Sequence, residues 1–366
     1  MSQRRALFVI LGDDPGGSER VVCSLASELA RDPAWRTEVF VATHRKTPSF
    51  VGANLPPEVT VEFGEGLGLR AGALSILRRL SGRRYDFLFS TNTVGNVVLS
   101  LMRTLRLIRA ERFVTRESTV PLARFSGLKA LAYRLMYRVY GGQTLIVAQT
   151  STMAAGLRGV LPRRLHQRIR VQPNPVDWAS LEAGASAPLD APTRAQLAGA
   201  DNVLFCGRLI EVKRPRLALE AFAHAAAQTE RPLRLVFLGK GPLEDEVRAR
   251  AAELGVEERV LFLGYRTDPH AVMSACQYGI LTSSHEGYPN VVPEMLACGV
   301  RRVVVTDCAG DLDRLKGVDV VREGTPQALG EALIGALRSP SPATGEQRAQ
   351  MRERSAAGFL DAILGR

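Results

Sequence analysis

Two spacings of apolar residues alternate along the first half of the chain. Short continuous apolar runs, typical of strands buried in a parallel sheet, are each followed by a stretch with apolar residues three or four positions apart, typical of an amphipathic helix. Residues 5–11 form the first such run, residues 12–17 a glycine-rich turn, and residues 18–29 the first helical stretch. The alternation predicts a doubly wound, mostly parallel α/β sheet. Its further strands are expected at residues 35–41, 59–63, 86–90, 112–115 and 144–148, and its further helices at residues 71–80, 95–109 and 127–140.

The same pattern restarts near residue 202, which predicts a second domain of similar architecture. Residues 180–200, between the two halves, are rich in Ala, Pro and Gly and show little periodicity, as linkers do. A chain of 366 residues is long enough for two domains. We therefore expect a first domain over residues 1–177, a linker over 178–200, a second domain over 201–345 and a C-terminal helix over 346–366.

The loop and helix between the apolar runs 278–282 and 303–305 carry two carboxylates in a glycine-containing turn. Glu286 lies on the loop, and Glu294 follows eight residues later, early in a helix that is expected to start near Val291. Gly287 would let a ligand approach the backbone closely, and the first N–H groups of the helix would point at the same place. The pattern predicts a pocket for an anionic ligand. The alternative is a surface loop followed by an ordinary amphipathic helix.

Two further turns have the composition of phosphate-binding loops. In the first half, Gly16 and Gly17 stand at the start of a helix, although the turn lacks both the G-x-G-x-x-G spacing and the lysine of a Walker motif. In the second half, Arg208 and Lys213 flank a strand-to-helix turn, where two cations can bind a diphosphate. The alternatives are a glycine turn needed only for its geometry and two solvated cations.

The stretch S-S-H-E-G-Y-P-N-V-V-P-E-M-L-A-C-G resembles the E-x(7)-E signature of a retaining glycosyltransferase family with the GT-B fold, the glycosyl transferases group one. The resemblance implies two Rossmann-like domains facing a central cleft. It places Glu286 against the donor sugar, Glu294 on the ribose, and Arg208 and Lys213, within G-R-L-x-x-x-K, on the pyrophosphate. Catalytic roles are implied for Glu286, Arg208 and Lys213. The implied nucleotide-sugar-binding residues are Gly16, Gly17, Arg208, Lys213, Tyr265, Arg266, Glu286, Gly287, Tyr288, Pro289, Asn290, Val291 and Glu294.

Two segments of the first half are interpreted through the same resemblance. Arg116 and Glu117 stand at the end of a predicted strand, where they are candidates for the acceptor side, although relatives usually have a His or an Arg-Asn pair there. A salt-bridged turn is the alternative. N-P-x-D at residues 174–177 resembles the segment that ends the first domain. The helical tail resembles one that returns to the first domain.

The implied reaction is hexosyl transfer from a nucleotide-diphosphate sugar to a hydroxyl acceptor, with retention at the anomeric carbon and without a metal or other cofactor. The expected setting is bacterial surface polysaccharide or glycolipid assembly. Asp311-Leu312-Asp313 fits the D-x-D metal signature of another fold, but it lies outside the loop which that fold needs, so we interpret it as a helix start. The alternative functions are a GT-B sugar-nucleotide epimerase and a basic nucleic-acid-binding protein.

The positive charge of the chain is concentrated in the first half. The net charge is +11, while residues 68–170 contain 19 Lys and Arg against three acids. Such asymmetry indicates a polyanionic partner, either nucleic acid or an anionic membrane. The few aromatic residues and the absence of zinc-ligand spacing argue against nucleic acid.

A basic amphipathic helix is predicted over residues 128–139, with Lys129, Arg134 and Arg138 on or near its polar face. This pattern predicts peripheral contact with an anionic membrane and a glycan or lipid-linked acceptor. The alternative is that the apolar face packs on the sheet of the first domain. The apolar face consists of Leu128, Leu131, Ala132, Leu135, Met136 and Val139.

The cysteines and the longest apolar runs bear on the location of the protein. Five cysteines without C-x-x-C spacing indicate buried thiols instead of a disulfide framework or a zinc site. No apolar run reaches the length of a membrane span, and residues 1–12 do not have the pattern of a signal peptide. We therefore expect a cytoplasmic protein, peripheral on the inner face of the membrane.

Overall fold

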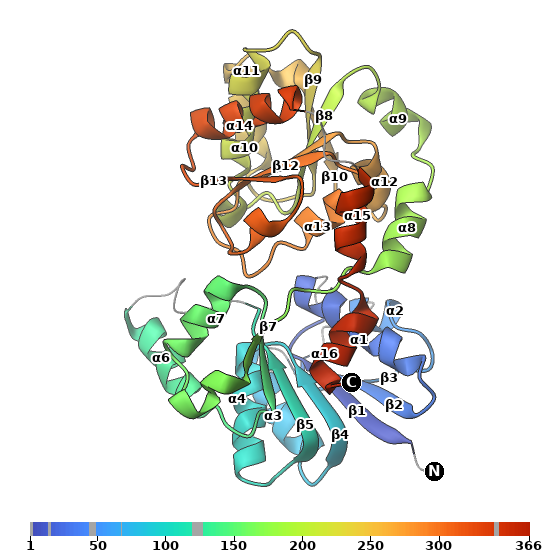
Figure 1. Cartoon of the computed structure of the whole chain (residues 1–366), viewed down its shortest axis with the longest axis vertical. Helices are drawn as coiled ribbons and strands as arrows, with labels where there is room; N and C mark the ends of the chain where they lie inside the picture. The colour runs from blue at the N-terminus through green and yellow to red at the C-terminus, as the bar shows by residue number, and fades with distance from the viewer. Residues whose placement is uncertain (1–2, 14–15, 44–48, 67, 119–126, 340–343) are drawn as a thin grey trace. The chain divides into compact units, whose positions relative to one another are not determined.

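The computed structural model describes residues 3–13, 16–43, 49–66, 68–118, 127–339 and 344–366. The chain divides into two compact units, Met1–Pro175 with Arg354–Arg366, and Val176–Glu353. Each unit contains one parallel sheet with helices on both faces (Figure 1). Among the helices that the structure describes, none is both long and apolar enough to cross a membrane.

The first domain contains a seven-stranded sheet in the order β3-β2-β1-β4-β5-β6-β7. All paired strands run parallel. The strands are β1 (Arg4–Ile10), β2 (Trp35–Val41), β3 (Thr60–Phe63), β4 (Arg84–Ser90), β5 (Arg109–Arg116), β6 (Leu145–Ala148) and β7 (Ile169–Val171). The helices are α1 (Gly17–Ala30), α2 (Phe50–Ala53), α3 (Leu69–Leu80), α4 (Thr93–Thr104), α6 (Gly127–Arg138), α7 (Ser151–Arg158), the 3-10 turn η1 (Arg163–Arg168) and α16 (Ala356–Leu364).

The alternation of side chains along each strand separates two helical layers in this domain. Phe8 and Ile10 of β1 point to a core that includes residues of α1 and α16. Leu7 and Val9, one residue out of phase, point to a core that includes residues of α3 and α4. Because both faces are covered, the central strands contain continuous apolar runs, such as residues 6–10 of β1.

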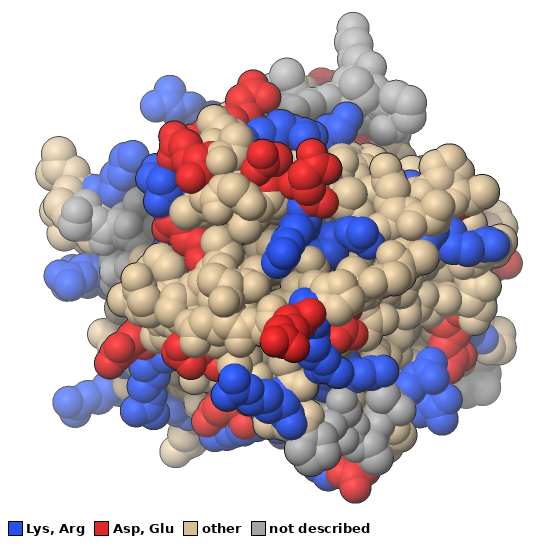
Figure 2. Space-filling model, turned by 90° about the horizontal axis from the view of Figure 1, so that it is seen from above, with Lys and Arg blue, Asp and Glu red and all other residues tan. Residues whose placement is uncertain are grey.

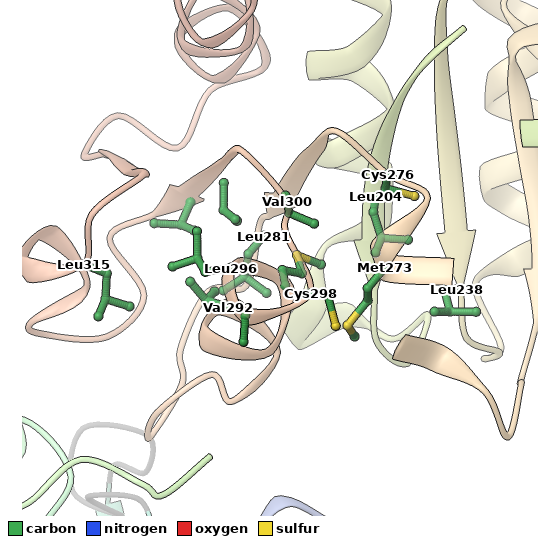
Figure 3. Packing of buried hydrophobic residues seen from close by; sticks show 14 of the residues in the cluster. Leu204, Leu238, Met273, Cys276, Leu281, Val292, Leu296, Cys298, Val300 and Leu315 are labelled. Atoms are coloured by element: carbon green, nitrogen blue, oxygen red, sulfur yellow. The ribbon is translucent and has the colours of Figure 1, made fainter. Parts of the chain in front are cut away.

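The second domain contains a six-stranded parallel sheet in the order β10-β9-β8-β11-β12-β13. Figure 3 shows part of the core on one side of this sheet, where Val292 and Leu296 of α13 lie near Leu281. The strands are β8 (Asp201–Cys206), β9 (Leu233–Leu238), β10 (Val260–Gly264), β11 (Tyr278–Leu281), β12 (Arg302–Thr306) and β13 (Val318–Val321). The helices are α8 (Trp178–Ser186), α9 (Ala191–Leu197), α10 (Pro215–Ala226), α11 (Glu244–Glu253), α12 (Pro269–Ser274), α13 (Val291–Ala297), α14 (Pro326–Arg338) and α15 (Thr344–Arg352), with 3-10 turns η2 (Glu211–Lys213), η3 (Glu257–Arg259) and η4 (Leu312–Arg314).

Residues 178–200, expected to be a linker, form α8 and α9 of the second domain. The side chain of Asp177 accepts a hydrogen bond from the Ser180 N–H, and that of Asp190 accepts one from the Thr193 N–H, so both helices start with a side-chain cap. The many Ala, Pro and Gly residues hid this pattern in the sequence. The tail also divides, since α15 belongs to the second unit and α16 to the first.

Candidate functional site

The strand order of the second sheet reverses between β8 and β11, which lie side by side. In open α/β sheets, ligands bind beyond the carboxyl ends of the strands at such a reversal. The turn after β8 and the loop after β11 leave the same edge of the sheet because the strands are parallel. They carry the predicted site residues Arg208, Lys213 and Glu286.

Hydrogen bonds join these two loops into one unit. The Ser284 N–H donates to the carbonyl of Val212 at 2.8 Å, and the Thr282 hydroxyl lies 2.9 Å from the carbonyl of Lys213. Arg214 has a φ of 47°, which is unfavourable for a residue with a side chain. Its guanidinium donates to the carbonyls of Thr282 and Ser283 at 2.7 and 3.1 Å, which holds the turn in this conformation.

Lys213 and Glu286 form an ion pair in the middle of this unit. The ammonium Nζ lies 2.5 Å from Oε1 of Glu286, and the Ser283 hydroxyl donates to the same oxygen at 2.6 Å. The side chains of the two charged residues are 22% and 15% exposed, so the pair is partly shielded and still open to a ligand. An anionic ligand can compete with Glu286 for the ammonium, and ligand hydroxyl groups can donate to the carboxylate.

Arg208 supplies a second cation to the same turn. Its side chain is exposed and makes no hydrogen bond or ion pair with any residue in the described part of the chain. A Cβ atom on the adjacent Gly207 would lie 4.0 Å from Cε of Lys213, so the lysine stem runs beside this turn. The turn therefore presents one unpaired cation and one that is paired with Glu286.

The neighbouring turns of this sheet edge approach one another through backbone atoms alone. A Cβ atom on Gly239, whose φ is +144°, would lie 2.0 Å from the carbonyl oxygen of Gly207. The Gly239 N–H donates to the carbonyl of Gly264 at 2.8 Å. Glycine is required at position 239 because any side chain there would overlap the backbone of the β8 turn.

The loop that follows β11 divides its predicted site residues between surface and core. Tyr288 and Pro289 are buried, and the Tyr288 ring packs in the core around α13, so these side chains help to position the loop. Glu286 and Gly287 are half-buried, as are Asn290, the N-cap of α13, and Val291. The half-buried side chains of Glu286, Asn290 and Val291 and the backbone of Gly287 can contact a ligand without leaving their positions.

Glu294, the second predicted carboxylate, lies in the first turn of α13 and is half-buried. Burial, followed by the negative charge of Glu294, raises the pKa of the Cys298 thiol to about 12. Burial and the charge of Glu286 do the same to Cys308. All five cysteines are free thiols, and four of them are buried, which agrees with the sequence prediction.

The turn after β10 contains Tyr265 and Arg266, which the family resemblance includes among the nucleotide-sugar-binding residues. Tyr265 is 63% exposed. The Arg266 guanidinium instead binds Asp268 at 2.7 Å and Asp190 at 2.8 Å. The Thr193 N–H and the Arg266 guanidinium together lower the pKa of Asp190 to about 2. The Arg266 side chain therefore ties α9 to this turn, and a ligand would meet the Tyr265 ring or the backbone.

The first-domain candidates occupy two different environments. Gly16 is the N-cap of α1, and Gly17, its first residue, is exposed, so both can be approached by a ligand. Residues 14 and 15 of the same predicted loop lie outside the described residues. Arg116 and Glu117 are fully buried, with exposed fractions of 1% and 0%.

Arg116 is held by neutral acceptors within the first domain. Its Nε and Nη2 donate to Oδ1 of Asn174 at 3.0 and 2.6 Å, and its Nη1 donates to the Thr91 hydroxyl at 2.5 Å. Nδ2 of Asn174 donates in turn to Gln149 at 3.1 Å. Burial lowers the pKa of Arg116 to about 10.

Glu117 accepts four hydrogen bonds inside the same domain. Thr93 and Asn96 donate at 2.8 and 2.6 Å, and the hydroxyls of Tyr137 and Tyr140 also donate to the carboxylate. Burial raises the pKa of Glu117, and these hydrogen bonds oppose that rise. The expected acceptor contact of Arg116 and Glu117 does not fit their burial, and a salt-bridged turn does not fit their neutral hydrogen-bond partners. Residues of α4 and α6 enclose Glu117, whereas Thr91 and Asn174 enclose Arg116, so both side chains lie inside the domain.

Helix α6 exposes the apolar face that the sequence predicted. Leu128 is 85% exposed, and Leu131, Leu135 and Val139 are also exposed. The side that packs on the domain instead carries Tyr137, next to Glu117. The alternative in which the leucine face packs on the sheet is therefore wrong.

Asp311-Leu312-Asp313 begins a single 3-10 turn, η4, with Asp311 3.3 Å from Arg314. Within the described ranges, no three His, Cys, Asp or Glu side chains are grouped as metal ligands. The structure also adds residues that the sequence analysis missed, namely Ser283, Arg214 and Asn174. The available signal for Ser283 was its hydroxyl, three residues before Glu286 in the same loop.

Comparison with known proteins bears on both domains. Residues 200–339 match the family model of the glycosyl transferases group 1. The second domain thus matches the family that the sequence resembled. The match includes Arg208, Lys213, Glu286 and Glu294.

Two curated relatives match shorter stretches. One is the N-acetylgalactosamine-N,N'-diacetylbacillosaminyl-diphospho-undecaprenol 4-alpha-N-acetylgalactosaminyltransferase of Campylobacter jejuni, 38% identical over 117 residues, which are 32% of this chain and 31% of the relative. The other is the lipopolysaccharide core biosynthesis glycosyltransferase LpsE of Rhizobium meliloti, 32% identical over 133 residues, 36% of each chain. The chain thus spans about a third of the length of these relatives.

Solved structures match the whole chain. Anabaena Alr3699/HepE in complex with UDP and glucose superimposes with a TM-score of 0.79 at 17% identity, covering 99% of both chains. The apo form of the lipopolysaccharide outer core galactosyltransferase WaaB gives 0.69 at 16% identity, also over 99% of both chains. The predicted fold class, α/β with two Rossmann-like domains of the GT-B kind, is confirmed.

Proposed function

We propose that this protein is a glycosyltransferase that moves a hexosyl group from a nucleotide-diphosphate sugar to a hydroxyl acceptor with retention of configuration. The observation that carries the proposal is the Lys213–Glu286 pair, with the exposed Arg208 on the same sheet edge, inside the segment that matches the family model. The site offers two cations for a diphosphate and one carboxylate for sugar hydroxyls.

The chemistry follows from the charge that develops in the reaction. As the bond between the anomeric carbon and the diphosphate oxygen breaks, the electron pair and negative charge pass to the leaving diphosphate. Arg208 and Lys213 stabilise that charge. The acceptor oxygen then bonds to the anomeric carbon, and its proton passes to the oxygen of the leaving diphosphate. Because the cations supply the charge stabilisation, the proposal requires no metal ion.

The role of Glu286 changes when the donor binds. In the free protein its carboxylate pairs with Lys213 and accepts from Ser283. A diphosphate that takes over the Lys213 ammonium would leave Glu286 free to accept hydrogen bonds from the donor sugar. Glu294 would bind the ribose, and the first domain would bind the acceptor.

The names of similar proteins support a proposal for the biosynthetic pathway class and for the donor substrate. The names of matching proteins refer to lipopolysaccharide core synthesis and to a diphospho-undecaprenol acceptor. Titles of matching structures refer to UDP and UDP-glucose. We therefore propose a UDP-sugar donor and a glycan or lipid-linked acceptor in bacterial surface polysaccharide or glycolipid assembly. The protein would work in the cytoplasm, on the inner face of the membrane.

A panel of nucleotide sugars tests this function. We expect UDP or a UDP-sugar to raise the melting temperature, and the matching donor to be hydrolysed slowly without acceptor, equally with and without a chelator. GDP-sugars and a short DNA duplex are the controls. Loss of all turnover with the chelator would contradict the metal-free mechanism. Conversion of the donor to an epimeric sugar nucleotide would indicate an epimerase instead.

Replacing Glu286 and replacing Glu294 should have different effects on the enzyme. We expect Glu294→Ala to weaken nucleoside diphosphate binding, because a ribose contact is made equally in the ground state and the transition state. Glu286→Ala should mainly lower kcat, by on the order of 10²-fold, because it contacts the reacting sugar. Calorimetric titration with UDP and steady-state kinetics separate the two effects. Equal losses of UDP affinity in both variants would contradict the assignment.

A further inference from the structure

Three helices of the first domain and the residues that directly follow two of them contain no acidic residue. Residues 69–80, 93–108 and 127–140 hold eight Lys and Arg and none of the 37 Asp and Glu of the chain. They comprise α3, α4 with the turn that follows it, and α6 with its last turn. The first unit as a whole has 28 basic against 13 acidic residues, whereas the second has 20 against 24. We call the outer surface of these three segments the acid-free face.

The acid-free face also carries most of the exposed apolar side chains. Among the residues that the structure describes, twelve large apolar side chains are exposed, and ten of them belong to these three segments. The two others are Val171 and Tyr265. The ten are Leu69, Leu74, Leu77, Leu101, Leu105, Leu107, Leu128, Leu131, Leu135 and Val139.

The three segments lie on one side of the first sheet. Ile76 of α3 and Leu99 of α4 pack with Phe113 of β5. Tyr137 of α6 packs with Ile146 of β6, which lies on the same face of the sheet as Phe113 by the register of β5 and β6. α3 contacts α4.

The end of α4 also packs close to the end of α6. A Cβ atom on Gly142, shortly after α6, would lie 2.6 Å from Cγ of Arg103 in α4. α4 therefore contacts α3 and also approaches the segment of α6. The leucines and arginines of all three segments thus belong to one helical layer.

Charge and apolar exposure together select the occupant of this face. Leucines that stand out beside arginines on the same helices fit an interface where leucines enter the acyl region and cations stay at the headgroups. A second copy of the chain would bring the same positive charges together. A nucleic acid would make no use of the leucines. The face of the molecule that Figure 2 shows differs from the acid-free face, because acidic and basic side chains are interspersed on it.

We propose that the acid-free face docks the first domain on an anionic lipid bilayer. The predicted membrane contact of α6 thereby extends to α3 and to the end of α4. Three helices in one layer would fix how the domain is oriented on the bilayer, which a single helix would not. The inference rests on the proposed function in one respect only, namely that the acceptor is linked to a lipid.

Flotation of the full chain with vesicles tests the proposal. We expect the protein to float at low salt with phosphatidylcholine vesicles that contain phosphatidylglycerol, to stay at the bottom with phosphatidylcholine alone, and to be released by high salt. The variant R70Q/R78Q/R134Q/R138Q removes four exposed charges from α3 and α6 and should weaken binding by about tenfold or more. The variant R259Q/R301Q/R322Q/R338Q, with the same charge change on the second domain, should float like the wild type.

Leucine variants separate this face from a general attraction of basic protein to lipid. L128S/L131S/L135S on α6 and L69S/L74S/L77S on α3 should each reduce binding, and both should keep the wild-type melting temperature because the side chains are exposed. Equal loss in the two arginine variants, or unchanged binding in both leucine variants, would overturn the proposal. The proposal would also be overturned if the wild-type protein floated with neither kind of vesicle and the leucine variants changed it from a dimer to a monomer. Vesicles without acceptor or donor keep this test separate from transferase activity.

Discussion

Replacing Lys213 with Ala is expected to lower kcat/KM for sugar transfer by on the order of 10²- to 10³-fold, about 2 to 4 kcal/mol of transition-state stabilisation. Lys213 has two tasks in the proposed mechanism. It stabilises the leaving diphosphate, and in the free protein it neutralises Glu286 at 2.5 Å. Its loss leaves a half-buried carboxylate without its cation, next to the position where a second negative charge must bind. Steady-state kinetics with the donor identified by the nucleotide-sugar panel measure the effect.

The matched variants of this prediction are Arg208→Ala and Lys316→Ala. Arg208→Ala should also reduce transfer by about 2 to 4 kcal/mol, without the additional exposure of an unpaired Glu286. Lys316, an exposed lysine of the same domain that pairs with Glu346, should be replaceable without effect. Unchanged turnover in both Lys213→Ala and Arg208→Ala would remove the proposed diphosphate site.

Replacing Arg116 with Ala is expected to destabilise the first domain by about 3 to 5 kcal/mol, because the change leaves buried acceptors on Asn174 and Thr91 without donors and opens a cavity. The side chain is among the largest that the structure buries fully. Arg116→Met, which keeps most of the volume and removes a desolvated charge, should cost less.

The two tryptophans of the chain allow the first domain to be observed alone. Trp35 lies in the first unit and Trp178 in the second, so a Trp178→Phe background leaves fluorescence from the first domain only. Urea unfolding in this background measures the effect of Arg116→Ala. Arg84→Ala, which removes an exposed arginine paired with Glu111, should change stability by about 1 kcal/mol or less. If the Arg116→Ala protein unfolds like the wild type but does not transfer sugar, the structural role is contradicted and Arg116 is again a candidate for the acceptor site.

The contrast between Arg116 and Lys213 shows what a cation at the end of a strand can do. Arg116 is the last residue of β5, and Lys213 lies in the turn that follows β8. Arg116 is enclosed by neutral acceptors and fully buried, whereas Lys213 lies on an open turn with a carboxylate partner. Only the second arrangement leaves a positive charge within reach of a ligand.

Local patterns in the sequence determined the two sheets and the loop with its two carboxylates. Apolar spacing reflects burial of each element on its own, so most strands and helices could be placed from neighbouring residues alone. The loop from Ser283 to Asn290 could be recognised because its turn residues and both glutamates lie within twelve residues. Helices α8 and α9 escaped because Ala-rich stretches show little apolar contrast, and only their caps, Asp177 and Asp190, marked them.

Tertiary structure alone decided which charged groups meet. Lys213 and Glu286 are separated by 73 residues, and Arg116 and Asn174 by 58. No local spacing reports such pairs, since they form only when neighbouring strands bring distant turns to one edge of a sheet. This is why the sequence proposed Arg116 and Glu117 as candidates for the acceptor side, whereas the structure buries both in the interior.

The same limit applies to α6. Its sequence determined which face is apolar, but not which face is covered. The buried carboxylate of Glu117 takes hydroxyl donors from Tyr137 and Tyr140, so the tyrosine side turns inward and the leucines remain in solvent. A buried carboxyl group that lacks hydrogen-bond partners is costly inside a domain, and these two hydroxyls supply partners to Glu117.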